Sequence, residues 1–251
     1  MSYIYETHSH TREASRCGIM HGKDYAAYMS ARGYSGQIIT DHFFNGNSRV
    51  PSFYSWKDKV EMYCSGYEAA RKAAEGTGFT VMFGIEFNFE GDEYLIYGPD
   101  KAWLLDNPDI MMMDRPAVHE AVHKAGGIMI QAHPYRERDY LNTIHLTPSI
   151  ADGIEIYNAA NGDNMNALAY EYAGKLGVPM TAGSDIHFAY DGLMGGMSFE
   201  HRIESVQDYV RAIKNGEGTP VIMRNGTAIP VTSSGSQTVP VSGPTLPVIM
   251  H

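Results

Sequence analysis

Short apolar runs alternate with longer amphipathic stretches along most of the chain. The runs are rich in β-branched and aromatic residues, as is typical of buried strands, and they cover residues 3–5, 36–40, 79–83, 127–132, 153–157, 178–182 and 220–223. Between them, apolar residues recur with helical spacing, which predicts helices over residues 23–32, 57–75, 116–124, 164–175 and 206–214. A glycine follows most of these helices closely, as expected at a helix C-terminus.

The order of these elements predicts an α/β fold. Alternating strands and helices favour parallel strands joined by right-handed crossovers, and six or seven such units suit a barrel better than a small open sheet. Residues 94–97 are an exception, because they can pair with residues 87–89 as a hairpin through Gly91. Residues 192–196 predict a flexible loop. We therefore expect a single barrel domain over residues 1–224 and an extended tail over residues 225–251.

Composition narrows the classes of function. The chain of 251 residues can bury a barrel-sized core, and its net charge of −10 argues against a surface that binds duplex nucleic acid. Two cysteines, Cys17 and Cys64, provide no disulfide framework. We see no signal-peptide pattern and no apolar run of membrane-spanning length, so we expect a cytoplasmic protein.

Residues able to bind metal or exchange protons follow the predicted strands. In barrels of this kind, functional groups lie where strands end and loops begin. The residues at these positions are His8, His10, Asp41, His42, Glu86, His133, Glu155, Asp185 and His187. His8 and His10 are two apart on a strand, so their imidazoles point the same way.

This set of imidazoles and carboxylates predicts a site for more than one divalent metal ion, with Zn, Mn or Fe as the candidates. Glu86 is placed to bridge two ions. Arg136 follows His133 and could hold a phosphate at the mouth of the site, as could Arg12 from the first loop. The alternative for both arginines is an ordinary solvated side chain.

A second motif competes with this interpretation. Residues 119–123 read His-Glu-Ala-Val-His, which matches the zinc-protease signature on a helix. The apolar stripe of that helix consists of Val118, Ala121, Val122 and Ala125. His119 and His123 then lie on its flank, so we interpret the motif as the exposed face of an amphipathic helix. A protease would also leave the other histidine cluster without a role.

Five short motifs resemble those of the PHP family (polymerase and histidinol phosphatase), which are metal-dependent phosphoesterases. They occur in the family's order over residues 1–215 and are His8-Ser9-His10-Thr11, Thr40-Asp41-His42, Gly84-Ile85-Glu86, Ala132-His133-Pro134 and Gly183-Ser184-Asp185-Ile186-His187. The resemblance implies a distorted (β/α)7 TIM-like barrel that holds two to three divalent ions.

The resemblance also implies which residues hold each ion. By motif position, one ion would be held by His8, His10, Glu86 and Asp185, a second by Glu86 and His133, and a third by His42 and His187. Asp41 would orient its neighbour. The chain departs from the family where Arg16 and Cys17 stand in the first loop and where Tyr94 stands on the strand after Glu86, because many members carry a metal ligand at these positions. His21 lies nearby but is offset by several residues. Seven ligands remain instead of nine.

The implied activity is hydrolysis of a small organic phosphate ester, as in histidinol phosphatases. A hydroxide generated on the metals would attack phosphorus, with Asp185, His187 and Glu86 as the catalytic residues. The expected partner is a small phosphate ester, and neither a membrane nor nucleic acid is expected. Two alternatives stay open: a metal-dependent hydrolase of another bond, such as an amide, and a non-catalytic or regulatory PHP-like domain with a partial metal site.

Overall fold

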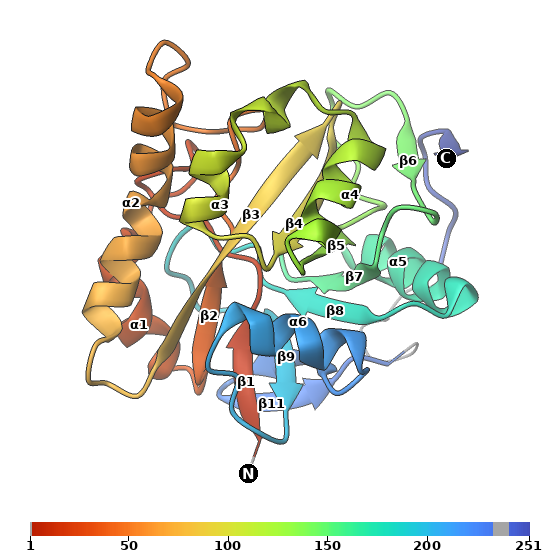
Figure 1. The fold of residues 1–251 in the computed structure, drawn as a ribbon. Helices are drawn as coiled ribbons and strands as arrows, with labels where there is room; N and C mark the ends of the chain where they lie inside the picture. Colours follow the sequence, from red (N-terminus) through yellow and green to blue (C-terminus); the bar gives the residue numbers. More distant parts are fainter. Residues whose placement is uncertain (1, 233–240) are drawn as a thin grey trace.

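A computed structural model describes residues 2–232 and 241–251 and contains one large sheet, one small sheet and helices around them (Figure 1). The strands of the large sheet are β1 (Tyr3–Glu6), β2 (Gly36–Ile39), β3 (Thr80–Phe89), β4 (Asp92–Tyr97), β5 (Ile128–Gln131), β7 (Gly153–Asn158), β8 (Met180–Gly183), β9 (Met194–Phe199), β10 (Thr219–Arg224) and β11 (Thr227–Pro230). The helices are α1 (Gly22–Ser30), α2 (Trp56–Ala74), α3 (Lys101–Asp106), the 3-10 helix η1 (Pro108–Met112), α4 (Arg115–Lys124), α5 (Asp163–Leu176) and α6 (Val206–Lys214).

The large sheet is mixed and curls into a half-barrel. Its strand order is β11-β10-β9-β1-β2-β3-β4-β5-β7-β8. Strands β1, β2 and β3 pair in parallel, as do β5, β7 and β8, whereas β4 and β9 to β11 run antiparallel to their neighbours. The α/β prediction is confirmed. A (β/α)7 barrel would have parallel strands throughout. Here the series is interrupted by the four antiparallel strands β4, β9, β10 and β11.

The hairpin predicted through Gly91 is present. Phe89 on β3 pairs with Asp92 on β4, which leaves Glu90 and Gly91 as a two-residue turn with φ values of 56° and 105°. Two consecutive residues with positive φ match the twist of the flanking strands. The hairpin fixes which residues of β4 share a face with Glu86.

The prediction of a flexible loop at residues 192–196 is wrong for residues 194–196. Residues Met194–Phe199 form β9, which pairs with β1 and β10. A Cβ atom on Gly195 would lie 2.1 Å from the carbonyl oxygen of Gly183, so glycine is needed where β9 passes the end of β8. The Gly195 N–H donates to Ser184 Oγ at 2.8 Å, which ties the two strands together.

The predicted tail is partly ordered against the body. Strand β10 matches the predicted strand at residues 220–223, and β11 pairs with it. The short strand β12 (Val248–Met250) pairs in parallel with β6 (Ile144–Leu146) to form the small sheet. Residues 233–240 of the predicted tail lie outside the described residues. None of the helices in the described part of the chain has the length and apolar character needed to cross a lipid bilayer.

The five predicted helices all form, and each buries one apolar stripe. Val118 and Val122 of α4 pack near Met129 of β5, while Tyr209 and Ile213 of α6 pack in the cluster that contains Tyr5 of β1. In Figure 1, α2 stands at one side of the sheet and α6 lies over β1 and β9. This packing holds the sheet rigid beneath the loops that carry the polar residues.

Candidate metal centre

His8 and His10 follow β1 and project to the same side, as their spacing predicts. The backbone around them continues as a short parallel ladder, in which His10 N donates to Ile186 O at 2.9 Å and Ile186 N donates to His8 O at 3.2 Å. Both imidazoles are fully buried. Their Nε2 atoms lie 3.5 and 3.0 Å from Asp185 Oδ1. The ladder therefore brings residues far apart in the sequence to one point.

Glu86 is the centre of the cluster. Its Oε1 lies 3.0 Å from His8 Nε2 and 3.2 Å from His133 Nε2, and its Oε2 lies 2.6 Å from His42 Nδ1 and 3.4 Å from His10 Nε2. One buried carboxylate thus faces four imidazoles. The strand ends predicted to converge do so, and Glu86 lies between them.

Hydrogen bonds at the far side of three rings determine which nitrogen faces the cluster. His8 Nδ1 lies 2.9 Å from Glu155 Oε1, His10 Nδ1 lies 3.2 Å from Ser15 Oγ, and His187 Nδ1 lies 2.7 Å from the carbonyl oxygen of Asp185. A ring that donates from Nδ1 keeps a free lone pair on Nε2. This is the arrangement that a metal ligand requires.

Asp41 lies behind the cluster. Its carboxylate accepts from Thr11 N at 2.6 Å, Thr11 Oγ1 at 2.7 Å and Ser15 Oγ at 2.6 Å. Ser15 in turn contacts His10, so Asp41 acts on the cluster through the first loop. Burial raises the pKa of Asp41 to about 7, against the opposing effect of these hydrogen bonds. The position suits the orienting role that the family resemblance implies.

The donor atoms fit divalent cations. His8 Nε2, His10 Nε2, His42 Nδ1 and Glu86 Oε2 are buried and make no hydrogen bond among the described residues. Buried polar atoms without partners are costly, and facing lone pairs of N and O donors are what Zn, Mn and Fe bind. Ligand atoms lie within 4.8 Å of one another in four overlapping sets: His8-His10-Asp185, His8-Glu86-His133, His42-Glu86-Glu93 and His10-His42-His187.

Electrostatics keep the acids of the cluster ionised. Burial would raise the pKa of Glu86, but His42, His8 and His10 outweigh it and hold that pKa well below its usual range. Burial likewise opposes the ionisation of Asp185, yet His8 and Arg136 hold its pKa well below the ordinary value. Both carboxylates are therefore ready to bind cations at neutral pH.

Two residues of the cluster have strained backbones. His133 has a φ of 30° and Asp185 a φ of 55°, both in the left-handed region that non-glycine residues seldom occupy. Strain of this kind persists only where the surroundings enforce it, and it concentrates at functional sites. His133 lies two residues beyond the end of β5 and Asp185 two residues beyond the end of β8, where the turn aims the side chain inward.

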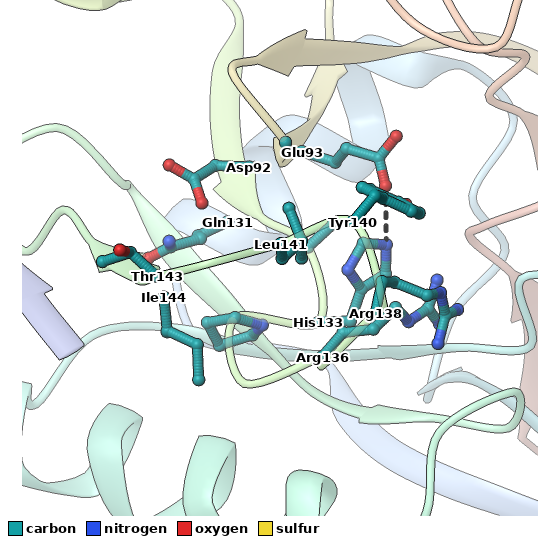
Figure 2. Close-up of a pocket in the computed structure, with 13 residues that line it drawn as sticks. Asp92, Glu93, Gln131, His133, Arg136, Arg138, Tyr140, Leu141, Thr143 and Ile144 are labelled. Carbon is teal, nitrogen blue, oxygen red and sulfur yellow. Dashed lines mark ion pairs between the residues drawn. The ribbon is translucent and has the colours of Figure 1, made fainter. Parts of the chain in front are cut away.

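Glu93 belongs to the cluster, although the sequence did not predict it. Its Oε1 lies 3.5 Å from His42 Nδ1. Its Oε2 lies 3.6 Å from His133 Nε2 (Figure 2). Tyr94, the position compared with the family, bonds Thr147 instead, with its hydroxyl 2.7 Å from Thr147 Oγ1. The register of the hairpin explains why Glu93 lies on the side of the cluster. Leu95 pairs with Glu86, and Glu93, two residues before Leu95 on β4, shares the face of Leu95.

The first loop adds Cys17 but not His21. Cys17 is half-buried, and burial raises the pKa of its thiol, but the neighbouring His187 and His42 outweigh burial and lower that pKa to about 6. A thiolate there would face the same rings as a bound cation. His21 pairs with Glu13 at 2.9 Å on an exposed part of the loop.

The two predicted substrate-binding arginines differ in their surroundings. Arg136 is held beside the cluster, where its three nitrogens donate to Asn161 at 2.6 Å, Asp185 at 2.6 Å and Asn158 at 2.7 Å. Arg12 is exposed, and its side chain makes no ion pair or hydrogen bond with the described residues. The structure therefore brings Arg136, but not Arg12, into contact with the cluster.

A family model described as PHP-associated matches residues 164–217, which include Asp185 and His187. Comparison with curated proteins gives no match. The family match thus covers the last of the five sequence motifs, at residues 183–187, and the chain from within α5 to the end of α6.

Solved structures share the fold at low identity. A two-domain protein from Bacteroides vulgatus ATCC 8482, described as containing a predicted PHP-like metal-dependent phosphoesterase, has a TM-score of 0.65 and 17% identity, over 88% of this chain and 64% of that one. A lesion-specific endonuclease from Pyrococcus furiosus has a TM-score of 0.55 and 13% identity, over 88% of this chain and 58% of the endonuclease chain. An amidohydrolase from Chromobacterium violaceum has a TM-score of 0.53 and 13% identity, over 88% of this chain and 98% of the amidohydrolase chain. The chain thus shares a fold with these structures, and residues 164–217 match the PHP-associated family model.

Proposed function

We propose that this chain is a metal-dependent phosphoesterase that hydrolyses a small organic phosphate ester. The observation that carries the proposal is the ring of four imidazoles around Glu86, in which His8 and His10 are held so that Nε2 faces inward. His187, stacked on His10, is held by the same kind of hydrogen bond. Phosphoryl transfer depends mainly on positioning and on charge stabilisation, which a set of cations in such a ring supplies.

The proposed ligands fall into three groups, which suit two to three divalent ions such as Zn, Mn or Fe. They are His8, His10, Glu86 and Asp185; Glu86, His133 and Glu93; and His42 and His187, with Cys17 proposed to complete the last group from the first loop. Glu93 and Cys17 fill the two places that the sequence left empty. When bound, the ions neutralise the phosphoryl oxygens and lower the pKa of water. In the chain itself, Glu155, Ser15 and the carbonyl of Asp185 hold the rings in the required orientation.

Two arginines at the cavity beside the cluster suit the substrate's phosphate. A guanidinium has five N–H groups, so Arg136 keeps two after its contacts with Asn161, Asp185 and Asn158. Arg138 lines the same cavity and makes no ion pair with a carboxylate in the described part of the chain (Figure 2). The cavity is partly open to solvent and has a volume of about 20 Å³, room for about one water molecule. The loop that carries Arg138 would therefore have to move outward to admit an ester.

The test is to replace Asp185 with Ala and to assay hydrolysis of an aryl phosphate with added Mn²⁺. We expect a loss greater than the roughly 10–100-fold typical of residues that only support metal ligands. His201→Gln serves as the control, because His201 pairs only with Glu217 among the described residues, at 3.7 Å. Undiminished turnover in the Asp185 variant would contradict the assignment.

Two other functions remain to be separated by experiment. One similar fold is named an amidohydrolase and another a lesion-specific endonuclease. A panel of phosphomonoesters, phosphodiesters, a damaged oligonucleotide and amides identifies the bond that is cleaved. A non-catalytic domain would show no turnover on any of them and less than one ion per chain by elemental analysis.

A further inference from the structure

A second group of metal-binding side chains lies on α4, apart from the cluster around Glu86. His123 Nε2 lies 2.8 and 2.9 Å from the two carboxylate oxygens of Asp152, and His119 Nε2 lies 3.4 Å from Asp152 Oδ1. The two imidazole centroids are 4.0 Å apart. Two rings therefore present the same nitrogen to one carboxylate.

Rigid elements hold the three side chains in place. His119 and His123 are four residues apart on a helix, so they lie one turn apart on the same face. Asp152 precedes β7, where its Oδ2 accepts from Met129 N at 2.7 Å and its own N–H donates to Met129 O at 2.8 Å. Contacts at the beginnings of β5 and β7 thus hold the Asp152 carboxylate opposite α4.

This group is distinct from the cluster around Glu86. Asp152 and Met129 lie at the beginnings of β7 and β5, whereas His133 follows the end of β5. The protease chemistry suggested by the sequence motif also fails, because Glu120 pairs with Lys124 Nζ at 2.6 Å on the exposed side of the helix. The two histidines remain as ligands without a catalytic base.

We propose that His119, His123 and Asp152 bind a Zn²⁺ ion, with solvent as the fourth ligand. Donor atoms about 2.0–2.1 Å from a tetrahedral zinc lie about 3.3 Å apart, close to the separation of His119 Nε2 from Asp152 Oδ1. The side chains are 21%, 42% and 21% exposed, so an ion has access from solvent. The site joins α4 to the sheet.

An ordinary ion pair accounts for less of this geometry. One protonated imidazole satisfies Asp152, and His123 already contacts both of its oxygens. A second protonated ring, with its centroid 4.0 Å away, would repel the first, whereas a neutral ring that carries its proton on Nδ1 would present the Nε2 lone pair to a cation. A shared zinc ion explains why both rings point to the same carboxylate.

The test compares zinc binding by the full chain with that of His119→Gln, His123→Gln and Asp152→Asn. Titration against a chromophoric chelator should give one fewer bound Zn²⁺ per chain in each variant, and Co²⁺ substitution should lose one tetrahedral absorption component. Hydrolysis of the aryl phosphate should stay unchanged. His201→Gln, an exposed histidine beside a single carboxylate, should retain the full number.

Thermal unfolding separates lost binding from lost folding. Without zinc, the His119→Gln variant should unfold at the temperature of the unmodified chain, and added Zn²⁺ should raise its unfolding temperature less. An unchanged zinc count in His119→Gln and Asp152→Asn overturns the proposal. That outcome is independent of phosphoesterase activity, because this site lies at the other end of the strands.

Discussion

At the scale of single residues, Ser15 links the acid behind the cluster to an imidazole within it. Its hydroxyl lies 2.6 Å from Asp41 Oδ1 and 3.2 Å from His10 Nδ1, and it also accepts from His42 N at 3.0 Å. A hydroxyl in this place fixes the tautomer of one ligand and the backbone of the next. Residues that hold metal ligands in place often affect affinity nearly as much as the ligands themselves.

We expect Ser15→Ala to weaken metal binding about 10–100-fold, because His10 loses the partner that keeps its Nε2 lone pair directed inward. Isothermal titration with Mn²⁺ measures the change. Ser48→Ala is the matched control: Ser48 is also buried and bridges to Ser15, but its hydroxyl contacts only Ala14 O and Val50 N among the described residues. Equal affinities for the two variants would contradict the role given to Ser15.

The residues of the cluster were predictable where they follow a strand directly. The spacing of His8 and His10, and the strand ends before His133 and Asp185, gave their common location without any tertiary information. Glu93 was missed because its face depends on the register of the β3–β4 hairpin. Ser15 and Arg138 were missed because their roles arise from contacts between loops, which no local pattern encodes.

At the scale of elements, the close approach of β8 to the loop after β1 positions His8. A Cβ atom on Gly183 would lie 2.6 Å from His8 Cβ and 2.9 Å from Glu155 Oε1, so both side chains would have to shift. Those two residues form the hydrogen bond that orients the His8 ring. The absence of a side chain at residue 183 is therefore part of the centre.

We expect Gly183→Ala to lose metal binding and phosphoesterase activity, because a displaced His8 no longer points at Glu86. Metal content by elemental analysis and turnover of an aryl phosphate are the measurements. In Gly174→Ala, on α5, the new Cβ lies 3.8 Å from Met180 Cε, an ordinary contact, and helical Ala is about 0.5–1 kcal/mol more favourable than Gly. That control should keep activity and unfold no more readily, whereas full activity in Gly183→Ala would refute the account.

Elements with a clear period were predicted and those defined by contacts were not. In the five helices, apolar residues recur every three or four positions, so the sequence alone was enough to locate them. Strand β9 begins Met-Gly-Gly-Met, which has the composition of a loop, yet its glycines allow the backbone to pass Gly183 and Tyr5. Only the neighbouring strands make that segment a strand.

At the scale of the whole molecule, the centre joins both halves of the sheet. Strands β1 to β3 supply His8, His10, His42 and Glu86, while the strands and loops from β4 to β8 supply Glu93, His133, Asp185 and His187. Four buried donor atoms there make no hydrogen bond among the described residues. Cations that bind these atoms therefore stabilise the fold across the sheet, and not only one loop.

We expect chelation to lower the unfolding temperature, because a ligand that binds only the folded state stabilises it by about 2.7 kcal/mol at 100 times its dissociation constant. Scanning calorimetry with Mn²⁺ and with EDTA measures the difference. The Asp185→Ala variant should show a smaller difference, and any remainder reports sites elsewhere. If EDTA left the unfolding temperature of the unmodified chain unchanged, the centre would not bind ions in a way that stabilises the fold.

The resemblance to the PHP family and the α/β class followed from the sequence, but the shape of the sheet did not. Motif order and alternating elements suffice for the first two. The position of β9 to β11 beside β1 depends on how a late segment packs against an early one. Pairing between segments so far apart produces no periodic pattern in the sequence of either one. The half-barrel could therefore be recognised only from the structure.

The central place of Glu86 makes the centre a single electrostatic unit. Its two oxygens face different imidazoles, so neighbouring ions would divide the charge of one carboxylate while repelling each other. Occupancy of one position must then alter the affinity of the next. A binding isotherm of this protein should rise in resolved steps, and mixed loading with two different metals should be easier to achieve than independent pockets would allow.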